Sequence, residues 1–254
     1  MTRAGKPDAA LTRRIEEASL NAWPAMEQLL MDGWLLRFSR GFTKRANSVV
    51  PLYPWTGNGR EPLAERVRHC ENLYAREGLQ TIFRLPAIDD NTALDAHLES
   101  RGYNLVDPTL VLVAPTRPGP GHEDFALVPA EHWLDIYAEL TGMPDTARKL
   151  HGAIVAGIPT PCGFAVLRRG ERPVACGLAV VERDLLGLFD IVTDPDARRS
   201  GHGTALVGSL LGWGHARGAR LAYLQMIESN VPASALYRKL GFEIAYNYWY
   251  RISP

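Results

Sequence analysis

Residues 188–206 constrain this chain more than any other stretch. They begin with an apolar segment typical of a buried strand and pass through a proline turn and an arginine- and glycine-containing loop into a helical pattern. The first turn of a helix carries main-chain N–H groups without intrahelical partners at the positive end of the helix dipole, which favours phosphate. Gly201 and Gly203 lack Cβ atoms where the backbone would approach an anion, and Arg198 adds positive charge. The pattern predicts a phosphate-binding loop; an ordinary helix entry with a flexible glycine pair is the alternative.

Two familiar phosphate loops do not fit this stretch. A dinucleotide-binding fingerprint requires a third small residue where this chain has Leu206, and a nucleoside-triphosphate loop requires Gly-Lys followed by Ser or Thr. The sequence therefore indicates a different phosphorylated ligand.

The composition is that of a globular protein and argues against several other classes. Of 254 residues, 46% are hydrophobic, and 28 basic residues balance 28 acidic ones, so the basic excess of a nucleic-acid-binding protein is missing. The three cysteines and seven histidines are scattered outside metal-binding spacings, which predicts no metal site. Because no apolar run has membrane-spanning length and residues 1–20 lack a signal-peptide core, we expect a cytoplasmic protein with neither a membrane nor a nucleic-acid partner.

A proline- and glycine-rich stretch divides the chain nearly in half. Residues 114–121 contain three prolines and two glycines, which disfavour both a helix and a central strand. We therefore expect an N-terminal domain at residues 1–114, a linker at 115–122 and a C-terminal domain at 123–254.

The two halves share a pattern at a constant offset. Helices predicted at residues 91–102 and 230–241 both end at glycine and lead through an aromatic residue into a strand, 139 residues apart. An internal repeat explains this offset; the general similarity of any two α/β halves is the alternative. Residues 54–62 stand where the first half would have its phosphate loop and lack the R-x-x-G-x-G spacing, and Leu98 stands where the second half has Tyr237. The first half is therefore expected to keep the architecture without the chemistry.

The loop and a second motif together resemble the GNAT superfamily of acyl-CoA-dependent N-acyltransferases. The loop matches the R-x-x-G-x-G pattern of that family at Arg198, Gly201 and Gly203, and residues 230–242 match its N-x-x-A-x-x-L-Y-x-x-x-G-F pattern. Two motifs in this order are more specific than either alone. The resemblance covers roughly residues 125–251, and the first half resembles the same fold weakly, as in tandem GNAT proteins. It implies an α/β (α+β) fold in which a mixed, largely antiparallel sheet is flanked by helices in each half.

The resemblance also implies acetyl-CoA as cosubstrate. Main-chain amides of the loop would hold the pyrophosphate, and the strand at 188–193 would diverge from the one at 221–227 to admit the pantetheine arm. The residues implied to bind the cosubstrate are Ile191, Val192, Thr193, Arg198, Arg199, Ser200, Gly201, His202, Gly203, Thr204, Asn230, Ala233 and Tyr237.

Acyl transfer to an amine needs an acid for the departing thiolate and a neutral amine. The resemblance places the Tyr237 hydroxyl near the thioester sulfur, which makes it the candidate acid; a core tyrosine is the alternative. Some family members carry a glutamate base where this chain has Gln225, whose amide cannot accept a proton at neutral pH. Asp190, an acidic residue within an apolar strand, is the preferred base and Glu228 the other candidate. A structural ion pair between Asp190 and an arginine, or loss of the proton to water, is the alternative.

The acceptor side is less defined. A hairpin predicted for residues 32–50, turning at 39–41, carries the polar candidates Arg45, Asn47 and Ser48. One face of the last strand carries tyrosines that either line an acceptor site or form a packed aromatic face between the halves: Tyr246, Tyr248 and Tyr250.

We expect an N-acetyltransferase, monomeric or homodimeric, that moves an acetyl group from acetyl-CoA to a primary amine of a small molecule or peptide by direct attack in a ternary complex. A non-catalytic acyl-CoA-binding or sensor module is the second hypothesis, which the missing glutamate permits. A structural interaction protein whose loop binds no nucleotide is the third.

Overall fold

The computed structural model describes residues 8–53, 62–87, 91–119 and 121–254. The strands are β1 (Glu27–Met31), β2 (Trp34–Phe38), β3 (Val49–Pro51), β4 (Ile82–Pro86), β5 (Asn104–Pro115), β6 (Phe125–Leu127), β7 (Cys162–Arg169), β8 (Arg172–Glu182), β9 (Leu185–Thr193), β10 (Leu221–Ile227) and β11 (Glu243–Ile252). The α-helices are α1 (Ala9–Ala22), α2 (Leu63–Arg76), α3 (Thr92–Ser100), α4 (Ala130–Thr141), α5 (Asp145–Ala156), α6 (His202–Ala216) and α7 (Val231–Lys239). The described 3-10 helices include η1 (Lys44–Ala46) and η3 (Pro195–Ala197). Among these described helices, none is long and apolar enough to cross a membrane.

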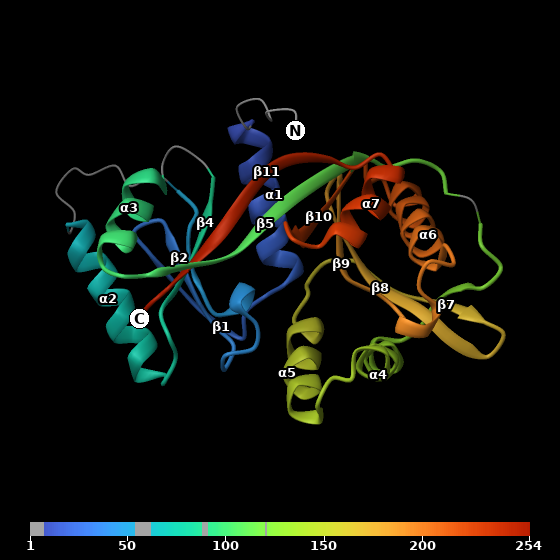
Figure 1. Ribbon diagram of the computed structural model, residues 1–254, viewed down its shortest axis with the longest axis horizontal. Helices are drawn as coiled ribbons and strands as arrows, with labels where there is room; N and C mark the ends of the chain where they lie inside the picture. The colour runs from blue at the N-terminus through green and yellow to red at the C-terminus, as the bar shows by residue number, and fades with distance from the viewer. Residues whose placement is uncertain (1–7, 54–61, 88–90, 120) are drawn as a thin grey trace.

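One sheet of eleven strands extends across both halves of the molecule, in the order β1-β2-β3-β4-β11-β5-β10-β9-β8-β7-β6 (Figure 1). Neighbouring strands are antiparallel except for β3–β4 and β9–β10, which are parallel. Helices cover the sheet on both sides. The expected mixed, largely antiparallel sheet flanked by helices is confirmed.

The internal repeat is visible in the positions at which the elements begin. The elements α2, β4, α3 and β5 begin at residues 63, 82, 92 and 104, and α6, β10, α7 and β11 begin at 202, 221, 231 and 243. Each pair differs by 139 residues, the offset that the sequence predicted. The tandem arrangement is therefore confirmed.

The last strand of each half pairs with the other half. Strand β5 of the first half pairs with β10, strand β11 of the second half pairs with β4, and β5 and β11 pair with each other at the centre. Each half therefore completes the sheet of its partner. Because hydrogen bonds between strands join the two halves into one sheet, the division into domains at residues 1–114 and 123–254 stays a proposal.

The first strands differ from the sequence prediction. The tight hairpin joins β1 to β2 through Asp32 and Gly33, both with positive φ. The predicted turn at 39–41 and the antiparallel pairing of the strands that flank it are present, but the second strand is β3 and not the whole of residues 43–50, because an irregular segment separates the turn from β3. The side chain of Asn47 accepts hydrogen bonds from the N–H groups of Ser39 and Gly41 (2.7 and 2.9 Å), which replaces strand pairing there. Of the first half's counterpart to the phosphate loop, residues 54–61 lie outside the described part of the chain.

In the second half, the sheet separates two apolar cores. Helices α6 and α7 pack on one face, where Leu206 and Tyr237 belong to one cluster of buried side chains. Helices α1, α4 and α5 supply the other cluster, which includes Ile15 and Trp133. Alternate side chains of a strand point to opposite faces of a sheet, so β9 contributes to both cores. Side chains on opposite faces of the sheet can therefore contact the same ligand only where the sheet is open.

Two of the four glycines in helix α6, Gly208 and Gly212, differ in the expected effect of substitution. A Cβ on Gly212 would lie 2.6 Å from the main chain of Gly119 in the linker, whereas a Cβ on Gly208 would have no neighbour within 4 Å. We expect Gly212→Ala to lower the free energy of unfolding by about 1–3 kcal/mol through overpacking. The control Gly208→Ala should raise it by about 0.5–1 kcal/mol, because alanine has the higher helix propensity. Urea titrations of both variants measure this, and a stabilised Gly212→Ala protein would contradict the close linker contact.

Candidate active site

The parallel strands β9 and β10 separate partway along their length. Their pairing runs from Leu185 with Leu221 to Leu188 with Leu224 and ends there, although β9 continues to Thr193 and β10 to Ile227. Beyond Leu188, the edge of β9 that faces β10 has no ladder partner from that strand. The divergence predicted from the sequence is therefore present, and it opens the sheet between the two cores.

Asp190 lies on a β-bulge beside this opening. Phe189 pairs with Leu178 and Val192 with Cys176, so Asp190 and its successor both stand opposite Gly177. The Asp190 backbone has φ +50°, in the left-handed region, which aspartate tolerates better than most residues. A Cβ on Gly177 would lie 2.5 Å from Cδ1 of Ile191, so a larger residue opposite the bulge would require the Ile191 side chain to move. Bulges of this kind re-aim a side chain, here that of Asp190.

The Asp190 side chain is held by a histidine. Nε2 of His151, on α5, lies 2.9 Å from Oδ2 of Asp190, and the His151 side chain is 1% exposed. A carboxylate only accepts hydrogen bonds, so His151 Nε2–H is the donor. The partner of Asp190 is therefore a hydrogen-bonded histidine and not the arginine of the ion pair considered as an alternative. No sequence motif marked His151.

Aromatic rings enclose the Asp190–His151 pair. The His151 ring lies 5.0–5.9 Å, centroid to centroid, from the rings of Trp23, Phe42, Trp133 and Tyr137. Burial, followed by the negative charge of Asp190, raises the pKa of Tyr137, so its hydroxyl stays protonated. The carboxylate therefore faces an apolar wall on one side and the opening in the sheet on the other.

The glycine loop, residues 198–203, leads into α6, and no side chain caps the first turn of this helix. Gly201 is the N-cap of α6 with φ +84°, and Arg199 has φ +62°. A Cβ on Gly201 would project into open space, whereas one on Gly203 would lie 2.7 Å from Leu236 of α7 and 3.3 Å from Oγ1 of Thr193. Gly203 thus lets the loop, the end of β9 and the second motif pack together. Main-chain amides at this helix start are available to an anion.

A proline turn fixes the entry to the loop. The Asp194 carboxylate accepts a hydrogen bond from the main chain of Asp196 (2.9 Å) and from Arg172 (2.5 Å). It also caps η3, which directly precedes Arg198. The loop therefore starts from an anchored turn.

The second motif forms α7. Asn230 is the N-cap of this helix, and its side-chain oxygen accepts a hydrogen bond from the N–H of Ala233 at 3.2 Å. Tyr237 is 8% exposed and packs edge-to-face on Phe242 at 5.6 Å. Burial raises the pKa of Tyr237 to about 12, so the phenol is protonated at neutral pH. The structure accordingly places Tyr237 on the α6–α7 face and Asp190 on the opposite face.

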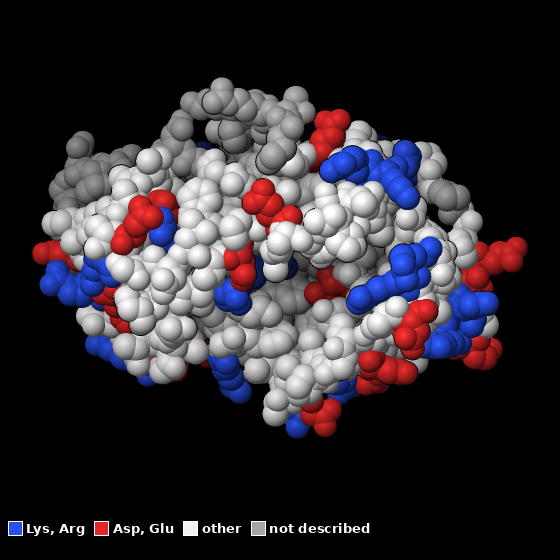
Figure 2. Space-filling model, in the orientation of Figure 1, with Lys and Arg blue, Asp and Glu red and all other residues white. Residues whose placement is uncertain are grey.

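A cavity of about 270 Å³ lies on the Asp190 side, between the halves. Figure 2 shows this face of the molecule hollowed near its middle. The cavity is lined by Trp23, Thr43, Lys44, Arg45, Asp107, Thr109, Asp190, Gln225, Ile227, Tyr248 and Tyr250. Of the sequence candidates, the structure brings Asp190, Gln225, Arg45 and two of the three tyrosines together here.

The remaining acceptor-side candidates have other places. Glu228 is exposed beyond the end of β10 and is not among the lining residues. The side chain of Asn47 accepts a hydrogen bond from the main chain of the loop after β2, and Ser48 is buried in the first half. Tyr246 is buried and donates a hydrogen bond to Glu16 at 2.6 Å. Trp23 and Asp107 were missed because they bear no motif and reach the cavity only through folding.

The opened parallel strands, the glycine loop at the start of α6 and the tyrosine helix that follows define an N-acyltransferase of the GNAT class. The chain belongs to the family described as "Probable histone acetyltransferase Rv0428c C-terminal", whose model matches residues 9–251.

Individual relatives agree with this membership. The uncharacterized N-acetyltransferase YobR of Bacillus subtilis (strain 168) is 29% identical over 248 residues, covering 94% of this chain and 98% of YobR. A GCN5-related N-acetyltransferase from Kribbella flavida has a TM-score of 0.71 at 18% identity and covers 95% of each chain. A tandem GNAT protein from the clavulanic acid biosynthesis pathway has a TM-score of 0.60 at 16% identity, covering 81% of this chain and 74% of that one. The two structures show the same fold.

Proposed function

We propose that this protein transfers an acetyl group from acetyl-CoA to the primary amine of a small molecule or peptide by direct attack in a ternary complex. The observation that carries the proposal is the opening between β9 and β10, which has the glycine loop and Tyr237 on one side and Asp190 on the other. Two substrates can meet in such an opening from opposite faces of the sheet.

The loop and the two motifs suit the cosubstrate. Main-chain amides from Arg199 to Thr204, at the positive end of α6, are suited to the pyrophosphate, and the open space beside Gly201 leaves room for it. Acetyl-CoA supplies the reactive thioester. The unpaired edge of β9 offers main-chain groups along Ile191, Val192 and Thr193 to an extended pantetheine arm. Asn230 and Ala233 lie at the start of α7, beside this route.

Asp190 is the proposed base. It takes a proton from the ammonium form of the acceptor, and His151 holds the carboxylate in place. The neutral nitrogen then forms a bond to the acetyl carbon while the carbon–sulfur bond breaks. Tyr237 donates its phenolic proton to the departing sulfur and regains one from the acetylated nitrogen through solvent, so that amine and acetyl-CoA give the amide and free CoA. The raised pKa of Tyr237 keeps its phenol protonated at neutral pH, so that the proton is present when the sulfur departs.

An amine panel with acetyl-CoA tests the proposal by following CoA release. Turnover of at least one amine is expected. Thermal stabilisation by CoA without turnover of any amine would favour the acyl-CoA sensor, and absence of both would favour a structural protein.

Tyr237→Phe removes the proposed acid and little else, since the ring packing on Phe242 is kept. We expect kcat to fall about 10²-fold, as for loss of a general acid, with the Kd of CoA near that of the native protein. Steady-state kinetics and calorimetric titration with CoA measure the two quantities. An unchanged kcat would remove Tyr237 from the mechanism.

A further inference from the structure

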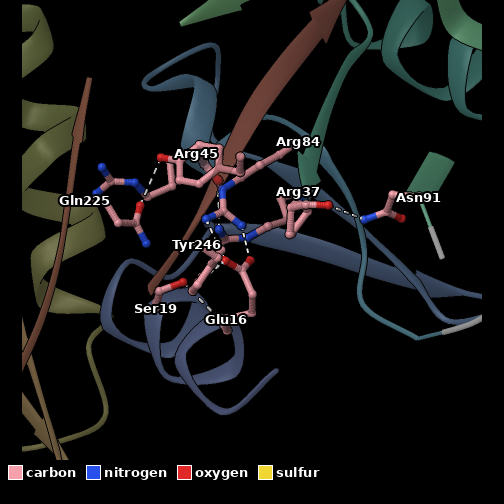
Figure 3. Close-up of polar contacts among 10 residues, drawn as sticks. Glu16, Ser19, Arg37, Arg45, Arg84, Asn91, Gln225 and Tyr246 are labelled. Carbon is pink, nitrogen blue, oxygen red and sulfur yellow. Dashed lines mark hydrogen bonds and ion pairs between the residues drawn. The ribbon is translucent and has the colours of Figure 1, made fainter. Parts of the chain in front are cut away.

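Arginines outnumber carboxylates around one end of the acceptor cavity. Arg84 is fully buried and forms an ion pair with Glu16, on α1. Arg37, also fully buried, donates instead to main-chain carbonyl groups of Leu20, Trp23 and Arg45. Burial and then the nearby charges of Arg84 and Arg45 lower the pKa of Arg37 to about 9. These three guanidinium groups are therefore close enough to repel one another (Figure 3).

Arg45 reaches the cavity itself with no carboxylate bound to it. Its guanidinium lies 5.6 Å from the ring centroid of Trp23 and 5.7 Å from that of Phe189, and Asp190 lines the same cavity. Its Nε is buried and has no hydrogen-bond partner within the described part of the chain. The carboxylates that line the cavity are already engaged, Asp107 with Lys44 at 2.8 Å and Asp190 with His151. Among residues 8–53, 62–87, 91–119 and 121–254, Arg45 thus forms no ion pair with a carboxylate.

Gln225 adds a second donor at this end. The Tyr248 hydroxyl donates a hydrogen bond to Oε1 of Gln225 at 3.0 Å, which leaves the amide nitrogen directed elsewhere. That nitrogen is buried and has no partner in the described structure. A buried donor without an acceptor costs free energy that a ligand can recover.

The surroundings of Tyr248 indicate that this end favours negative charge. The Arg84 guanidinium lies 3.8 Å from the centroid of the Tyr248 ring. Burial disfavours a tyrosinate, yet the charges of Arg84 and Arg45, together with hydrogen bonds to Tyr250 and Thr109, lower the pKa of Tyr248. The pKa of the neighbouring Tyr250 is raised, first by burial and then by Tyr248.

We propose that the acceptor is a small amine that also carries a carboxylate, as an amino acid does. Its carboxylate binds the Arg45 guanidinium and the Gln225 amide, and its amine faces Asp190. Guanidinium and carboxylate form strong charge-assisted hydrogen bonds. A peptide N-terminus has a neutral carbonyl at that position and would leave the Arg45 guanidinium without a carboxylate partner. This inference rests on the proposed acetyltransferase function and specifies its substrate class.

The test compares the 20 common amino acids with their carboxamides, using acetyl-CoA as donor. The kcat/KM of the preferred acid should exceed that of its carboxamide by about 10-fold to 10²-fold, because the carboxamide replaces hydrogen bonds to a charged group with hydrogen bonds to a neutral one. Arg45→Gln should abolish the preference mainly by raising KM of the acid, and Arg45→Lys should restore the preference in part. Arg40→Gln is the matched control, because Arg40 is an exposed arginine nearby in sequence that does not line the cavity.

The outcomes separate this inference from the proposed function. Equal turnover of acids and carboxamides, with no effect of Arg45→Gln, would overturn the inference and leave the acetyltransferase in place. Failure of every amine would overturn the proposed function. In that case thermal stabilisation of the CoA-bound protein by N-acetyl amino acids and by their carboxamides still tests the inference. Stabilisation by the acid alone, lost in Arg45→Gln, supports it, and equal stabilisation or none contradicts it.

Discussion

Asp190→Asn lowers kcat by about 10³-fold, within the range expected for loss of a general base, while the protein folds as before. Asparagine has the same shape as aspartate and tolerates the left-handed backbone at this position, where φ is +50°. It still accepts the hydrogen bond from His151 but takes up no proton at neutral pH.

Glu228→Gln is the matched control for this substitution. It removes the other carboxylate considered from the sequence, which lies exposed outside the lining of the cavity. Its kcat should stay within twofold of the native value, an effect on the order of experimental error for a group outside the reaction. A rate for Asp190→Asn close to that of Glu228→Gln would mean that solvent takes the amine proton.

Gly201→Val raises the Kd of CoA at least about 10²-fold, because its isopropyl group fills the space in which an anion would meet the amides of α6. The position has φ +84° with open space beside it, so the substitution does not collide with the protein. The backbone strain of a β-branched residue in the left-handed region costs on the order of 1–2 kcal/mol of stability.

Gly218→Val separates that strain from the loss of binding. Gly218 follows the other end of α6 with φ +92°, and a Cβ at this position would also have no neighbour within 4 Å. Both variants should lose similar stability in thermal unfolding, and only Gly201→Val should lose CoA affinity in calorimetric titration. Equal affinities would place the pyrophosphate elsewhere.

Residue types and their spacing in the sequence predicted the structural features that depend on residues close together in the chain. The glycines at 201 and 203 indicated a helix entry without a side-chain cap, and Asn230 indicated the start of the next helix. The constant offset of 139 residues predicted the repeat, because equivalent elements of two similar halves begin at equivalent residues. The alternation of Tyr246, Tyr248 and Tyr250 predicted a shared face, and all three are buried.

The neighbours of the site could not be predicted in this way. His151 is 39 residues from Asp190 in sequence, and Glu16 is 230 residues from Tyr246. Neither pair has a spacing that a motif records. The exchange of β5 and β11 brings Arg45 and Trp23 of the first half beside Gln225 and Asp190 of the second.

The order of residues along the chain was thus sufficient to specify the helix entries, the strand with Asp190 and the tandem architecture, because backbone conformation and side-chain periodicity are set within a few residues. That Asp190 is held by histidine and faces a cavity shared by both halves depends instead on the packed molecule. Such contacts arise from pairing between strands distant in sequence, whose free energy depends on the sheet as a whole.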